Sequence, residues 1–156
     1  MKAIIFYATK HGATAEIAQR IAEEINGAVI HNLKKDDIPS LADFDCVIIG
    51  SSVYAGNIHK EAKEFLLNRK NILLDKKLGL FVSGIGAEGE KKYFETNFPQ
   101  EILKKAKIAS FLGGIFNPAE ASGFECFIMK LAAKQSEYIN TIDDEKIIKF
   151  AETMKA

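Results

Sequence analysis

Two kinds of apolar pattern alternate along the chain. Short runs in which almost every position is apolar, such as AIIFYA at 3–8, are typical of strands buried on both faces of a parallel sheet. Longer segments carry apolar residues three and four positions apart, which is typical of a helix with one buried face. The expected strands are residues 2–8, 28–33, 45–51, 78–84 and 107–116, and the expected helices are residues 14–26, 58–69, 88–105, 123–139 and 143–155. This alternation predicts an α/β fold in which a five-stranded parallel sheet lies between two layers of helices.

Proline and glycine divide two of these segments. Pro99 falls inside the expected helix 88–105, and it should break or kink that helix because it cannot donate a backbone hydrogen bond. Gly113 and Gly114 interrupt the last expected strand. Ligands of parallel α/β sheets bind at the carboxyl ends of the strands, so the segments that follow the strands are the places to look for chemistry.

The composition fits a single domain over residues 1–156. Of the 156 residues 47% are hydrophobic, which is enough for an ordinary core. Lys plus Arg and Asp plus Glu both number 21, so the net charge is zero and no nucleic-acid partner is expected. Since no apolar run approaches the roughly 20 residues of a transmembrane segment, and the start does not resemble a signal peptide, we expect a cytoplasmic location. The two cysteines lack metal-ligand spacing, so no metal site is expected.

The segment after the first strand has the composition of an anion-binding loop. A helix N-terminus offers unpaired N–H groups and partial positive charge to an anion. Two threonine hydroxyls and one lysine add donors, and a glycine allows close approach of the backbone. In the alternative interpretation, Thr14 caps the helix and Gly12 only eases a turn. The predicted phosphate-binding residues are Thr9, Lys10, His11, Gly12, Ala13 and Thr14.

The segment after the third strand places one aromatic residue among small and hydroxylated ones. Tyr54 at the end of a parallel sheet makes a good stacking surface for a flat ring, although it can also fold down onto the following helix. The residues predicted to contact such a ring are Ser51, Ser52, Val53, Tyr54, Ala55 and Gly56.

The segment after the fourth strand, SGIGAEG at 83–89, contains three glycines. Its backbone can lie close against a ligand and donate N–H groups to a ring, or it can simply be a flexible connection. The predicted ligand contacts are Ser83, Gly84, Ile85 and Gly86. A phosphate cradle, an aromatic surface and backbone donors together favour a phosphorylated planar ring.

The sequence resembles the flavodoxin-like FMN proteins. Their phosphate motif, a hydroxyl residue followed by x-x-Gly-x-Thr after the first strand, is matched by TKHGAT at 9–14. The order of strands and helices is similar along the whole chain. The resemblance implies a three-layer sandwich with strand order 2-1-3-4-5 and noncovalently bound FMN, whose ring would lie between 51–56 and 83–86. It also implies one- or two-electron redox chemistry, in which the protein holds the ring and tunes its potential.

Within that superfamily, the chain looks most similar to the menaquinone-dependent protoporphyrinogen IX dehydrogenase group. VIIGSSVYAG at 47–56 resembles that group's second loop, and FECFIMKLAAK at 124–134 resembles the helix of its extended segment. This resemblance implies an oxidoreductase that uses a quinone as acceptor. Residues 108–129 contain no Lys or Arg, so a tetrapyrrole dicarboxylate would find few partners there. We therefore expect electron transfer to a redox partner protein, with the quinone-linked enzyme as the alternative.

The chain also departs from typical flavodoxins, which are acidic and often stack the flavin on a tryptophan. This sequence has zero net charge and no tryptophan. A flavin-free interaction domain is a third interpretation. The break at Gly113–Gly114 and the amphipathic helix after it predict that residues 114–130 form a cover beside the flavin edge. The apolar positions of that helix are Phe124, Phe127, Ile128 and Leu131.

The sequence assigns no catalytic residue. His11 is the imidazole nearest the phosphate loop, and it fits either an acid–base role or a solvent-facing position. His59 is expected to be structural or at the surface, and Cys46 a small core residue.

Overall fold

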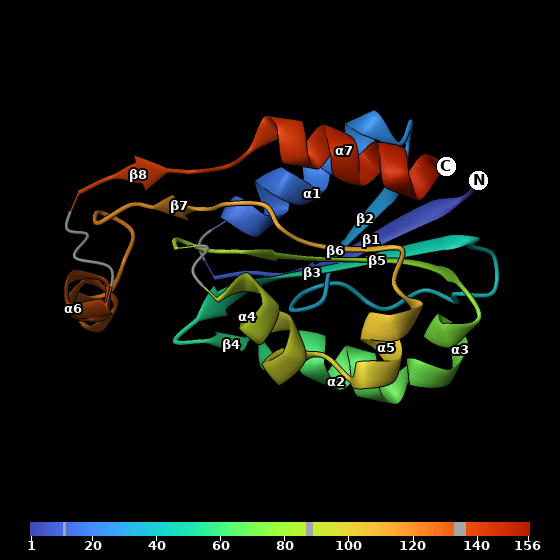
Figure 1. The fold of residues 1–156 in the computed structure, drawn as a ribbon, viewed down its shortest axis with the longest axis horizontal. Helices are drawn as coiled ribbons and strands as arrows, with labels where there is room; N and C mark the ends of the chain where they lie inside the picture. Colours follow the sequence, from blue (N-terminus) through green and yellow to red (C-terminus); the bar gives the residue numbers. More distant parts are fainter. Residues whose placement is uncertain (11, 87–88, 133–136) are drawn as a thin grey trace.

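The fold is a parallel sheet with helices on both faces (Figure 1). The computed structural model describes residues 1–10, 12–86, 89–132 and 137–156. The strands are β1 (Ala3–Ala8), β2 (Val29–Asn32), β3 (Cys46–Tyr54), β4 (Asn57–Ile58), β5 (Lys77–Ser83), β6 (Ile108–Phe111), β7 (Ile115–Phe116) and β8 (Ile139–Asn140). The helices are α1 (Ala13–Glu24), α2 (Lys60–Asn68), α3 (Lys70–Leu74), α4 (Glu90–Asn97), α5 (Gln100–Lys105), α6 (Gly123–Ala132) and α7 (Asp144–Lys155).

The main strands lie in the order β2-β1-β3-β5-β6, and each neighbouring pair is parallel. The short β4 lies off this path and pairs with β3 in antiparallel fashion. Counted without β4, the order is the expected 2-1-3-4-5, so the predicted α/β class is confirmed. The chain order reverses between β1 and β3, which makes the carboxyl ends of these two strands the switch point of the sheet.

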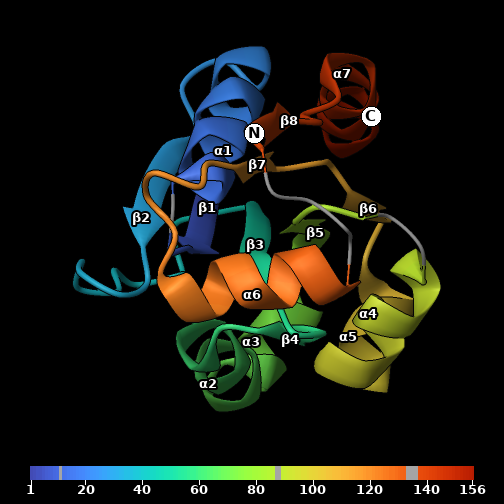
Figure 2. The same cartoon turned by 90° about the vertical axis from the view of Figure 1, so that its left-hand side faces the viewer.

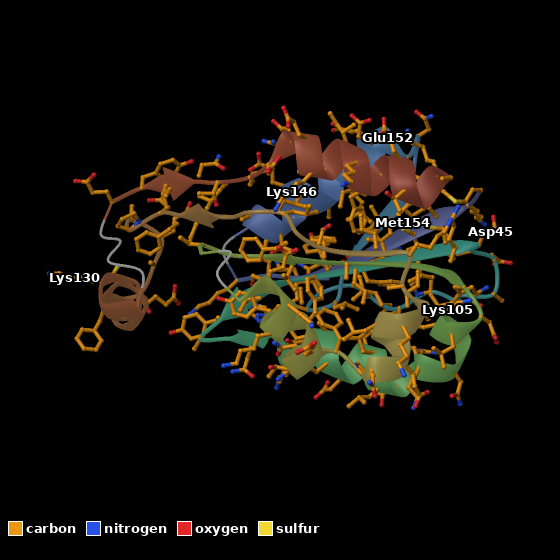
Figure 3. The ribbon with its side chains drawn as sticks, in the orientation of Figure 1. Asp45, Lys105, Lys130, Lys146, Glu152 and Met154 are labelled. Atoms are coloured by element: carbon orange, nitrogen blue, oxygen red, sulfur yellow. The ribbon has the colours of Figure 1, made fainter. Side chains whose placement is uncertain are left out.

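Two apolar layers hold the helices to the sheet. Helices α1 and α7 cover one face, and α2 to α5 cover the other (Figure 1). Because side chains alternate along a strand, Ile5 of β1 faces the first layer and Phe6 the second. Met154 of α7 lies against Gly79 of β5, while Glu152 points outward (Figure 3). No helix in the described part of the chain has both the length and the apolarity needed to cross a bilayer.

Strand β3 is longer than the sequence predicts. It continues past Ser51 to Tyr54, and Asn57–Ile58 returns beside it as β4, so the expected loop 51–57 and the expected helix start at residue 58 are both wrong. The reason is a two-residue turn in which Ala55 and Gly56 have positive φ angles of 48° and 79°. Such turns match the twist of an antiparallel pair.

The expected strand 107–116 is also wrong beyond Phe111. Gly113 has a φ of 85°, and a Cβ at this position would lie 1.9 Å from the Thr141 carbonyl oxygen. The chain therefore turns away from the sheet at this glycine, and β7 pairs with β8 in a separate two-stranded sheet.

The expected helix 123–139 ends early. Helix α6 is described over Gly123–Ala132, and residues 133–136 lie outside the described part of the chain. Ile139–Asn140 is strand β8, so the helix does not extend to residue 139. The expected break at Pro99 is confirmed, since α4 ends at Asn97 and α5 begins at Gln100. Figure 2 shows α6 lying across the carboxyl ends of the central strands.

Candidate functional site

The three segments singled out in the sequence meet at one edge of the sheet. Backbone pairing sets Ala8 beside Ser51 and Ser52 beside Ser83, so the ends of β1, β3 and β5 are adjacent. The Thr14 Oγ1 atom lies 2.6 Å from Ser83 Oγ, which links the first segment to the third directly. The expected gathering of these segments is therefore present in the structure.

The N-terminus of α1 is open. Its N-cap residue is Gly12, with a φ of 86°, and a glycine has no side chain with which to cap the helix. The Glu16 amide donates to the Gly12 carbonyl at 3.0 Å, so the N–H groups before it have no partner within the helix. No described atom lies within 4 Å of an ideal Cβ at Gly12. The helix dipole thus places partial positive charge at an N-terminus that no side chain caps.

Other groups of this segment are already engaged. Thr9 Oγ1 accepts a hydrogen bond of 3.3 Å from the Gly12 amide, which shapes the loop. Thr14 is fully buried in the first turn of α1 and bonds to the buried Ser83, so it does not cap the helix. Ala13 is buried as well, and His11 lies outside the described residues.

Lys10 reaches away from the loop toward α6. Its Nζ forms an ion pair with Glu125, and it also lies 5.8 Å from the centroid of the Tyr54 ring. The hydrogen bond to Glu125 raises the pKa of the Lys10 amine, so this cation keeps its charge at neutral pH. The Glu125 carboxylate is a site residue that the sequence did not predict, because its partner is 115 positions away.

Ser51 and Ser52 hold the start of α2. Ser51 Oγ accepts a hydrogen bond of 3.0 Å from the His59 amide and donates to the Ser52 carbonyl. His59 Nε2 lies 2.8 Å from Ser52 Oγ. The expectation of a structural His59 is consistent with these bonds, and they fix the serine hydroxyls before any ligand arrives.

Asn97 of α4 fixes the turn that follows Tyr54. This buried amide donates to the Gly56 carbonyl at 2.9 Å and to the Tyr93 carbonyl at 2.8 Å. Its Oδ1 atom accepts a hydrogen bond of 3.0 Å from the Ile58 amide. An Ala55 residue in the left-handed region costs roughly 1–2 kcal/mol, so the turn needs such support. Asn97 is a second site residue that the sequence did not reveal.

The segment after β5 packs against the glycine pair at 113–114. The Gly84 amide donates to the Gly113 carbonyl at 3.0 Å, and a Cβ at Gly114 would lie 2.7 Å from the Gly84 carbonyl oxygen. Ile85 is half-buried, and Gly86 has a φ of 87° with no described atom within 4 Å of an ideal Cβ. Residues 87–88 of the expected loop lie outside the described part of the chain.

A family model described as the flavodoxin domain matches residues 4–142 of this chain. The chain belongs to the flavodoxin domain family. The strand order, the switch point between β1 and β3 and the open N-terminus of α1 agree with this membership.

Known proteins resemble this flavodoxin domain over most of its length. The protoporphyrinogen IX dehydrogenase [quinone] of Escherichia coli strain K12 is 25% identical over 146 residues, which cover 87% of this chain and 81% of that protein. The crystal structure of oxidised flavodoxin 2 from Bacillus cereus has a TM-score of 0.63 and 21% identity, and the match covers 99% of this chain and 98% of that one. A flavoprotein from Lactobacillus acidophilus NCFM, solved in complex with FMN, has a TM-score of 0.51 and 18% identity over 72% of this chain and 90% of its own.

Neither cysteine of this flavodoxin domain belongs to the three segments. Burial raises the pKa of the Cys46 thiol to about 11, so it stays protonated and unreactive in the core, as expected. Cys126 lies on α6 and is half-buried. Among the residues that the structure describes, no group of three or more His, Cys, Asp or Glu side chains could hold a metal ion.

We predict that Asn97→Ala destabilises the flavodoxin domain by about 2–3 kcal/mol, because it removes three hydrogen bonds and leaves buried groups unpaired. Urea denaturation measures this change. Asn68→Ala is the matched control, since Asn68 is the last residue of α2 as Asn97 is of α4, but is exposed. Equal losses for the two variants would contradict the assigned role of Asn97.

Proposed function

We propose that this flavodoxin domain binds FMN noncovalently and serves in one- or two-electron transfer. One observation carries the proposal: the open N-terminus of α1 lies at the point where the strand order reverses. Unpaired N–H groups and the helix dipole favour a phosphate monoester there, and switch points of this kind are where open α/β sheets bind ligands.

The described residues fit both ends of FMN. The phosphate would lie at 9–14, where Gly12 leaves room for it and Lys10 adds charge. The ring would lie between 51–56 and 83–86, beside Tyr54, which is 39% exposed. Lys10 Nζ and the Tyr54 ring are 5.8 Å apart, so the charged loop and the aromatic surface are close enough to contact a single small molecule. Bound FMN would supply the redox chemistry, while these residues bind and orient it.

The proposed partner is another redox protein, and the proposed location is the cytoplasm. A neutral protein whose flavin site lies at one edge of its sheet suits a cytoplasmic electron carrier that docks to a redox partner protein. Side-chain hydrogen bonds of Asn97, Ser51 and Ser83 tie the segments around the site to one another. A rigid site of this kind suits a carrier because it limits rearrangement during electron transfer.

We predict that Lys10→Met weakens FMN binding by roughly ten- to a hundredfold and riboflavin binding by less than about twofold. Riboflavin lacks the phosphate, and a hydrogen bond to a charged group contributes roughly 1.5–3 kcal/mol. Methionine keeps the apolar stem of lysine and removes only the charge. Fluorescence titration of the apoprotein with each ligand measures both affinities.

Lys63→Met is the matched control for this test. Lys63 bonds to Asn57 beside the same edge of the sheet, but it belongs to α2 rather than to the proposed phosphate loop. It should leave the ratio of the two affinities unchanged. An equal loss of FMN and riboflavin in Lys10→Met would contradict the assignment of the phosphate to residues 9–14.

A quinone-linked oxidoreductase is the second candidate. The Escherichia coli relative matches 87% of this chain, and α6 lies across the edge where the flavin is proposed (Figure 2). Against it, residues 108–129 carry no Lys or Arg. A substrate with two carboxylates would have to lose water without gaining ionic partners there, which is costly.

We predict that the FMN-loaded protein passes electrons to artificial acceptors but shows no saturable oxidation of protoporphyrinogen IX with a quinone. An anaerobic assay that varies the porphyrinogen concentration tests this. Rapid and saturable turnover that disappears on deletion of residues 117–123 would favour the second candidate instead.

A further inference from the structure

Helix α6 lies at the tip of a short arm. The chain leaves the body through β7 and returns through β8, and these two strands pair with each other (Figure 1). The Thr141 amide donates to the Gly114 carbonyl at 2.8 Å, and the Gly114 amide donates to Thr141 Oγ1 at 3.1 Å. These two hydrogen bonds fix the base of the arm. The position of α6 then depends on the contacts that α6 makes with the rest of the protein.

The first turn of α6 presents Glu125 to the body. Ser122 Oγ accepts a hydrogen bond of 3.1 Å from the Glu125 amide, in the manner of an N-cap residue. The negative charge of Glu125 lies in the first turn, where the helix dipole favours it. Among the α6 side chains that the structure describes, Glu125 is the buried one at 4% exposure, whereas Phe127 is 58% exposed.

Glu125 is paired with the lysine of the proposed phosphate loop. Lys10 Nζ donates to Glu125 Oε1, so the ion pair joins the tip of the arm to the loop that begins α1. Since the carboxylate is buried, solvent and salt screen this pair less than an exposed one. A phosphate bound at 9–14 would compete with Glu125 for the charge of Lys10 and would repel the carboxylate.

We propose that the Lys10–Glu125 ion pair is a latch that holds α6 across the carboxyl edge of the sheet, and that a phosphate group bound at residues 9–14 loosens it. Only the loosening of the latch by a phosphate group rests on the proposed function. The ion pair itself is present in the protein without ligand. The cofactor-free site is then covered, and binding of the phosphorylated ring uncovers its edge for an electron partner.

Hydrogen–deuterium exchange of peptides from residues 123–132 tests the latch in the cofactor-free protein. Glu125→Gln should raise their exchange roughly three- to tenfold, because it removes the charge and keeps the shape. Glu120→Gln is the control, since Glu120 is exposed on the same segment. Because Glu125 is buried, the test is repeated with Lys10→Met, which changes the half-exposed member of the pair. The double variant should raise the exchange little beyond either single variant, because both changes break the same interaction. Unchanged exchange in both single variants would overturn the latch.

Ligand addition tests the second half. FMN should raise the exchange of 123–132 in the wild-type protein, riboflavin should not, and neither should raise it further in Glu125→Gln. Lower exchange in the presence of FMN would overturn the competition for Lys10. If the protein fails to bind FMN in a parallel fluorescence titration, the proposed function fails, while the result for the cofactor-free variants still decides whether the latch exists.

Discussion

The parallel pairing of β1 with β3 is the constraint on which the rest of the structure depends. It places Ala8 beside Ser51, so the two segments that follow these strands start as neighbours. Because the chain order reverses here, α1 crosses to one face of the sheet and α2 to the other (Figure 1). The N-terminus of α1 and the β3–β4 pair that carries Tyr54 therefore diverge from one point, and a ligand can lie between them.

Most of the polar groups described around this point are hydrogen-bonded to other groups of the protein. Thr14 bonds to Ser83, the two serines of β3 hold His59, and Asn97 holds the turn after Tyr54. Because these bonds already order the backbone around the site, a ligand does not have to spend binding free energy on ordering it. Lys10 differs from them, since a helix on a separate arm holds its charge. In the function and the latch proposed above, the same cation connects phosphate recognition with access to the site.

The long elements were predictable from sequence because their patterns are local. Runs such as AIIFYA and the helical spacing of α1 predicted these elements, and the resemblance implied the sheet order. The motif TKHGAT predicts the phosphate loop, and this assignment stays a prediction. Strands β4, β7 and β8 have only two residues each, which is too short for any periodicity to be seen. Asn97 could not be assigned because its partners in the turn, Gly56 and Ile58, lie 41 and 39 positions away. Glu125 could not be assigned because Lys10 lies 115 positions away. The sequence Ser-x-x-Glu at 122–125 marks a helix start, but nothing local to it identifies Lys10 as the partner.

The central claim is that the phosphate of FMN binds at the N-terminus of α1. A titration of the ¹⁵N-labelled protein with FMN, followed by amide chemical shifts, tests it most directly because each N–H group reports on its own surroundings. The largest shifts are expected for the amides of residues 12–15, 51–56 and 84–86, with saturation at one equivalent. Riboflavin should reproduce the shifts at 51–56 and 84–86 and leave those at 12–15 small. Shifts under FMN that spare residues 12–15 would contradict the account.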